Sequence, residues 1–72
     1  MKFVLVIWVC SFLGGKTTCM PPIQYTDLYN SWYECSRAVH TESVQILSEL
    51  GYKYVNDNKI GMSYSCRIVP SV

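Results

Sequence analysis

The chain has 72 residues, of which 50% are hydrophobic and 15% are charged. This balance excludes an intrinsically disordered segment, and the length allows a single small domain, residues 1–72, with a marginal core. The formal net charge is +1 and the basic residues are scattered, so the sequence provides no basic surface for a nucleic-acid partner.

The first segment is open to two interpretations. Residues 1–13 contain one lysine followed by an apolar run, which is the layout of a secretory signal peptide, although the residues near the end of the run make a poor cleavage site. Alternatively, residues 2–10 form a strand, because this stretch is rich in β-branched and aromatic residues. We favour the strand, since cleavage would remove Cys10 and leave an odd number of cysteines. The run is too short for a stable membrane span.

Turn and connection signals follow the apolar run. Residues 14–16 (Gly-Gly-Lys) predict a turn, and residues 21–22 (Pro-Pro) predict an extended connection that is not helical. We expect Thr26 and Asp27 to begin a short turn that leads into a helix.

The central part of the chain predicts one long helix. Ser31 and Glu34 have the spacing of a capping box, in which each side chain accepts a hydrogen bond from the backbone at the helix start. Apolar residues then recur at intervals of three and four as far as Leu50. Gly51 can adopt the left-handed conformation that ends a helix, so we predict a helix over residues 32–50.

The remaining residues predict strands. Residues 52–55 are compatible with a short strand, and residues 56–58 (Asn-Asp-Asn) are turn formers. Residues 59–69 alternate between apolar and polar side chains, which is typical of a half-buried strand. The predicted fold is therefore α+β or small α/β, with one central helix packed on a two- to three-stranded sheet and stapled by disulfides.

The cysteines are Cys10, Cys19, Cys35 and Cys66. An even number in so short a chain predicts two disulfides and an oxidising compartment, while four free thiols in a cytoplasmic protein are the less favoured alternative. If the first and last strands are parallel neighbours joined by the helix, all four thiols meet at one edge of the sheet. Every pairing is then feasible, and we favour Cys19–Cys35 with Cys10–Cys66. The long intervals between the cysteines disfavour a zinc site.

The sequence carries no recognisable catalytic set. His40 is the only histidine and has no acidic partner at a telling spacing, and the chain lacks both a phosphate-binding glycine loop and a Cys-x-x-Cys pair. We therefore predict a protein that is not an enzyme and that holds no cofactor or metal.

Tyrosines are unusually frequent, and three of them are evenly spaced. Tyr25, Tyr29 and Tyr33 fall at four-residue intervals, and Arg37 follows at the same interval. Tyrosine and arginine are enriched at protein interfaces, so these four residues are candidates for binding a partner. In the alternative that we favour for the tyrosines, their rings cover the margin of a small core and their hydroxyls contact water.

Several short motifs spread over nearly the whole chain carry a resemblance. They are Cys10-Ser11, Cys19 closely followed by proline, Tyr33-Glu34-Cys35, residues 55–59 (Val-Asn-Asp-Asn-Lys) and Tyr64-Ser65-Cys66. In these motifs the chain resembles short cysteine-containing proteins predicted from marine bacteriophage and metagenomic sequences, which have no established function. The resemblance implies a phage setting.

Two functions fit a small disulfide-bonded domain that binds a protein partner. The first is a structural or interaction protein, for example a virion component such as a capsid decoration protein. The alternative is a small secreted or periplasmic effector that binds a host protein, which the signal-like start and the cysteines favour.

Overall fold

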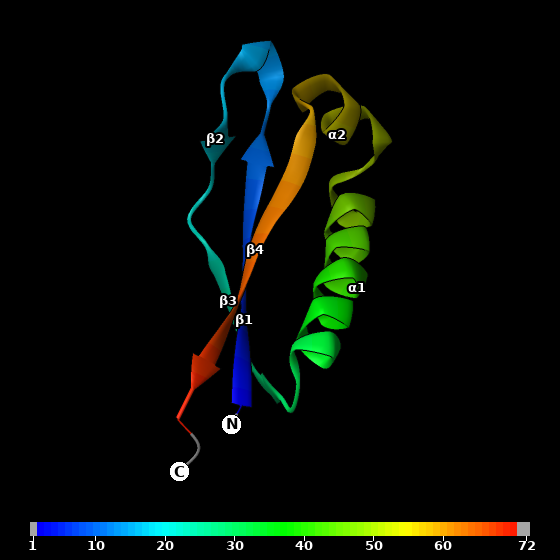
Figure 1. Ribbon diagram of the computed structural model, residues 1–72. Coiled ribbons are helices and arrows are strands. Elements are labelled where there is room, and N and C mark those ends of the chain that lie inside the picture. Colours follow the sequence, from blue (N-terminus) through cyan, green and yellow to red (C-terminus); the bar gives the residue numbers. More distant parts are fainter. Residues whose placement is uncertain (1, 71–72) are drawn as a thin grey trace.

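The computed structural model describes residues 2–70, which form a mixed α and β fold with one long and one short helix on a four-stranded antiparallel sheet (Figure 1). In chain order the elements are β1 (Lys2–Ser11), the short 3-10 helix η1 (Leu13–Gly15), β2 (Thr18–Cys19), β3 (Ile23–Tyr29), α1 (Trp32–Leu50), α2 (Tyr52–Asn58) and β4 (Ile60–Val69). This arrangement confirms the predicted α+β class, with a central helix packed on a sheet.

Strand β1 is the centre of the sheet. β4 pairs with it in antiparallel orientation along its whole length, from Lys2 opposite Val69 to Ser11 opposite Ile60. On the other side, β3 pairs with the first part of β1 and β2 with its last two residues. The strand predicted over residues 2–10 is therefore confirmed. Buried residues of β1 alternate between the two faces, with Leu5 and Ile7 on one face and Val6 on the other, which accounts for its continuous apolar sequence.

The prediction that the first and last strands run parallel is wrong, because the sequence interpretation missed β3. This strand carries the chain back along β1 before α1 begins, so that α1 runs in the direction of β1 and β4 returns against it (Figure 1). The turn expected at Thr26 and Asp27 is also wrong, because both residues belong to β3. Its register against β1 shifts between Val4 and Val6, and such an irregularity breaks the alternation by which a strand is recognised.

The predicted helix over residues 32–50 is confirmed at both ends. The backbone N–H of Glu34 donates to Ser31 Oγ at 3.1 Å, and the backbone N–H of Asn30 donates to Glu34 Oε2 at 3.0 Å. At the other end Gly51 has a φ of 90°, a conformation that side chains disfavour. Local backbone chemistry thus sets the limits of α1.

The strand considered at residues 52–55 is wrong, because Tyr52–Asn58 form α2. An ion pair of 2.7 Å joins Lys53 to Asp57 one turn later, and Asn58 Nδ2 donates to the carbonyl of Tyr54 at 3.0 Å. Lys59, with a φ of 52°, ends α2 and turns the chain into β4. The strand predicted over residues 59–69 is confirmed as Ile60–Val69.

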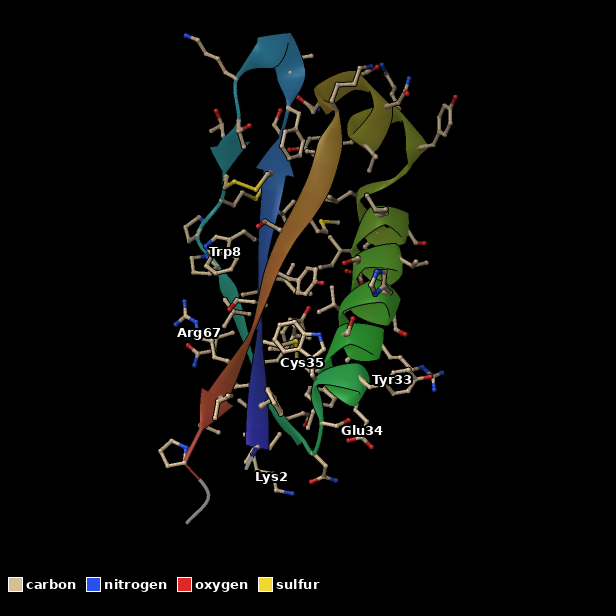
Figure 2. All side chains as sticks on the ribbon, viewed as in Figure 1. Lys2, Trp8, Tyr33, Glu34, Cys35 and Arg67 are labelled. Atoms are coloured by element: carbon tan, nitrogen blue, oxygen red, sulfur yellow. A yellow bond between two sulfur atoms is a disulfide. The ribbon has the colours of Figure 1, made fainter. Side chains whose placement is uncertain are left out.

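The core lies between α1 and one face of the sheet. Its buried residues are Leu5, Ile7, Cys35, Val39 and Cys66. In Figure 2, Cys35 lies on the sheet side of α1, whereas Trp8 and Arg67 project from the face that α1 does not cover. Within residues 2–70, no helix has the length and hydropathy needed to cross a membrane.

Candidate functional site

All four cysteines are paired, and the bridges are Cys10–Cys19 and Cys35–Cys66. The prediction of two disulfides is confirmed, but the favoured pairing of Cys19 with Cys35 and of Cys10 with Cys66 is wrong. Cys66 lies opposite Leu5 in the first half of β1, whereas Cys10 lies near the far end of that strand. The thiols therefore do not meet at one edge of the sheet, and because all four are oxidised none is present as a zinc-binding thiolate.

The two bridges differ in their surroundings. Cys35–Cys66 joins the first turn of α1 to β4, and both of its residues are buried in the core. Cys10–Cys19 joins neighbouring positions of β1 and β2, with Cys10 buried and Cys19 exposed. One disulfide therefore fixes the helix to the sheet, and the other closes the loop at the opposite end.

The structure divides the four candidate partner-binding residues into two pairs. Tyr25 and Tyr29 lie on β3, are half-buried and pack against the core cluster. Tyr33 lies on α1, is 70% exposed and points away from the sheet (Figure 2). Arg37 is also exposed and follows one helical turn later. Tyr33 and Arg37 thus form a shared surface, hereafter the Tyr33–Arg37 surface, to which Tyr25 and Tyr29 do not belong.

The half-buried tyrosines have altered acidity. Burial raises the pKa of Tyr25, and the nearby carboxylate of Glu42 raises it further. Burial likewise raises the pKa of Tyr29, with an added contribution from Asp27. Both effects disfavour the tyrosinate form. The environment of these two hydroxyls is therefore one that keeps them protonated, as expected for residues at the margin of a core.

An apolar hollow that the sequence did not predict lies where α1, α2 and the start of β4 meet. It has a volume of about 510 Å³ and is open to solvent. Its lining residues are Val44, Leu47, Ser48, Tyr52, Val55, Asn56, Lys59 and Ile60. Three of these eight residues come from α2, which the sequence interpretation replaced by a strand and a turn. The hollow is suited to receive an apolar side chain.

The single histidine lies on the exposed side of α1. His40 Nδ1 is 2.8 Å from the carbonyl oxygen of Ser36, and its ring centre is 6.5 Å from that of Tyr64 on β4. Within residues 2–70, no group of three or more His, Cys, Asp and Glu side chains is arranged to hold a metal ion.

Comparisons of the chain with protein-family models, with curated proteins and with solved structures found no match. Functional inference therefore starts from the two disulfides and the exposed surfaces.

Proposed function

We propose that this chain is a non-enzymatic structural or interaction protein that binds a protein partner through the Tyr33–Arg37 surface of α1. The observation that carries this proposal is the 70% exposure of the Tyr33 ring on a helix that is covalently fixed to the sheet. Exposed Arg37 extends the same surface by one turn. Aromatic and arginine side chains dominate the binding energy of many protein interfaces.

Rigidity of this surface supports the proposal. Cys35 lies in the same helical turns as Tyr33 and Arg37, and its disulfide to Cys66 joins them to β4. The Ser31 cap fixes the start of the helix. Because the backbone is already ordered, binding loses little conformational entropy, and more of the interaction energy appears as affinity.

A virion component, such as a capsid decoration protein, is the form of this function that we favour. The two disulfides support an oxidising compartment, and extracellular particles are exposed to one. The resemblance to proteins predicted from marine phage sequences supports the same setting. Such a protein needs a stable fold and a binding surface rather than a catalytic site.

The test is quantitative mass spectrometry of purified particles from a phage that encodes the chain. We expect the protein in stoichiometric amounts with the capsid, and we expect Tyr33→Ser to lower its incorporation. Leu28→Ser is the matched control, because Leu28 is 55% exposed on β3 and lies outside the Tyr33–Arg37 surface. Absence of the wild-type protein from the particles would exclude a virion component, and equal loss with both variants would exclude this surface.

The second candidate is a small secreted or periplasmic effector that binds a host protein, which the disulfides also favour. β1 provides core residues Leu5 and Ile7 and pairs with all three other strands. Removal of residues 1–13 would take away this central strand, so an exported form with this fold keeps the segment. Intact mass of the protein recovered from host periplasm or medium tests this: a folded product that lacks residues 1–13 would contradict it.

A further inference from the structure

The outer edge of β4 is the longest unpaired strand edge that the described part of the chain presents. β4 has ten residues and pairs only with β1 on its inner side. Figure 1 looks toward this edge, with β4 in front of β1 and no other strand before it. Such an edge exposes backbone donors and acceptors and is a template for pairing with another strand. Within Ile60–Val69 the edge has no proline and a single charged residue, Arg67, to oppose such pairing.

The hydrogen bonds of β1 show which residues of β4 face outward. The carbonyl of Val9 accepts from the backbone N–H of Met20 on the β2 side, so Cys10, next along β1, directs its backbone groups to β4. Cys10 lies opposite Gly61, and the odd-numbered residues of β4 therefore bond to β1. The even-numbered residues direct their N–H and C=O groups outward; they are Ile60, Met62, Tyr64, Cys66 and Ile68.

The side chains beside this edge are apolar and exposed. Tyr64 is 42% exposed and Ile68 is 60% exposed. Both lie two positions from buried Cys66 on β4, so their side chains project toward the same face, the one that α1 covers. The apolar hollow lies on the same face, at the other end of the strand, and includes Ile60. Exposed Ile68 at one end of β4 and the apolar hollow at the other end are complementary, so two copies related by a twofold axis can each place Ile68 in the hollow of the other.

Pairing of two copies of β4 about a twofold axis at Tyr64 brings these features together. In that antiparallel register Ile68 of the second copy lies opposite Ile60, beside the hollow, and the same contact occurs again by symmetry. Tyr64 lies opposite its own copy, so two half-exposed rings cover each other. Apolar side chains meet apolar side chains on one face, and serines meet on the other.

Charge does not oppose this association. Arg67 lies opposite Gly61 in this register, so that no like charges face each other on the paired strands. The net charge of +1 gives little long-range repulsion between copies. We propose that the β4 edge binds a second copy of this chain, which extends the sheet across a twofold axis and seats Ile68 of each copy in the hollow of the other. This dimer does not depend on the Tyr33–Arg37 surface.

Sedimentation equilibrium of the oxidised protein over a wide concentration range tests the proposal. We expect a monomer–dimer equilibrium whose dissociation constant rises at least about tenfold with Ile68→Lys, since a charge then enters an apolar hollow. Leu28→Lys is the matched control, because Leu28 is 55% exposed on β3, at the opposite edge of the sheet. A wild-type protein that stays monomeric at millimolar concentration would overturn the proposal, as would equal weakening by both variants.

A second pair of variants tests the backbone pairing itself. Tyr64→Pro removes an outward N–H without removing a bond to β1, and Tyr64→Val changes the side chain but keeps the N–H. We expect dimerisation to be lost in the first and only weakened in the second, which loses the contact between the two rings but keeps the backbone bonds, while circular dichroism shows that both variants fold. Equal weakening by the two variants would contradict pairing through the backbone of β4.

Hydrogen exchange measured by NMR then identifies the strand edge. The amides of Met62, Tyr64 and Ile68 should exchange more slowly as the dimer forms and quickly after dilution. A dimer in which these amides exchange freely uses another surface and overturns the proposal. If an added peptide of unrelated sequence protects the same amides in a protein that stays monomeric, the proposal that a second copy binds the β4 edge is overturned.

Discussion

Cys35 on α1 and Cys66 on β4 are joined by a disulfide through the core, with their Cα atoms 6.2 Å apart and a sequence separation of 31. On the chain-entropy account, closing a loop of that length stabilises the fold by roughly 3.7 kcal/mol, against roughly 2.6 kcal/mol for the separation of 9 at Cys10–Cys19. We therefore expect the double variant C35A/C66A to lose more stability than C10A/C19A.

Urea unfolding of the two double variants measures this difference. The loss of two buried sulfur atoms adds a cavity cost to the first variant, so the gap between the variants should exceed the entropic difference of roughly 1 kcal/mol. Equal midpoints, or a larger loss in C10A/C19A, would show that the bridge across the core is not the principal staple.

The exposure of Cys19 predicts the order in which the bridges are reduced. A thiol or phosphine must reach a sulfur atom, and Cys19 is exposed whereas Cys35 and Cys66 are both buried. Under native conditions Cys10–Cys19 should open first, while Cys35–Cys66 resists until the domain unfolds. Timed alkylation followed by peptide mass spectrometry checks the order. Early labelling of Cys35 would contradict the burial of the second bridge.

The Ser31 cap predicts a local contribution to stability. Its Oγ accepts from the backbone N–H of Glu34 at 3.1 Å, and Ser31→Ala leaves that donor without its partner. We expect a loss of about 1 kcal/mol, which lowers the melting temperature by roughly 4–8 °C in a domain of this size. Ser31→Asp retains an acceptor and should stay close to wild type. Equal melting temperatures for all three proteins would show that the cap does not stabilise the fold.

Local signals in the sequence were sufficient to predict α1 and β4. The capping box and Gly51 predicted both ends of α1, and the alternation over residues 59–69 predicted β4 within one residue. α2 was missed because the Asn and Asp residues at its end resemble a turn, although Lys53 and Asp57 have the i,i+4 spacing of a helical ion pair. The hollow that α2 helps to form was missed with it.

One missed strand accounts for the larger errors. β3 was hidden by its irregular register against β1, and without it the helix was taken to connect β1 directly to a parallel β4. The extra reversal places the start of α1, with Cys35, beside the half of β4 that holds Cys66. It also places Tyr25 and Tyr29 on a strand that packs against the core, whereas Tyr33 and Arg37 lie on α1. Tertiary topology, rather than local propensity, decided both the disulfides and the candidate site.

The raised pKa values of Tyr25 and Tyr29 predict how stability changes in alkaline solution. Burial, with a contribution from Glu42 at Tyr25 and from Asp27 at Tyr29, raises both pKa values above the ordinary 10.0. Above pH 10 the unfolded chain therefore releases protons that the folded chain retains. Ionisation of these tyrosines therefore does not lower the free energy of unfolding below about pH 10. The free energy of unfolding falls as the pH rises from there through the folded-state pKa.

Urea unfolding across this pH range, with intact mass used to confirm both disulfides, tests the tyrosine linkage. Tyr25→Phe cannot ionise, so the fall in the free energy of unfolding should be shallower than in the wild type. Tyr52→Phe is the control, because that side chain is 87% exposed and lies away from the core, and it should leave the slope unchanged. Identical slopes for Tyr25→Phe and the wild type would show that ionisation of Tyr25 is not coupled to unfolding. Its ring would then be a packing element alone.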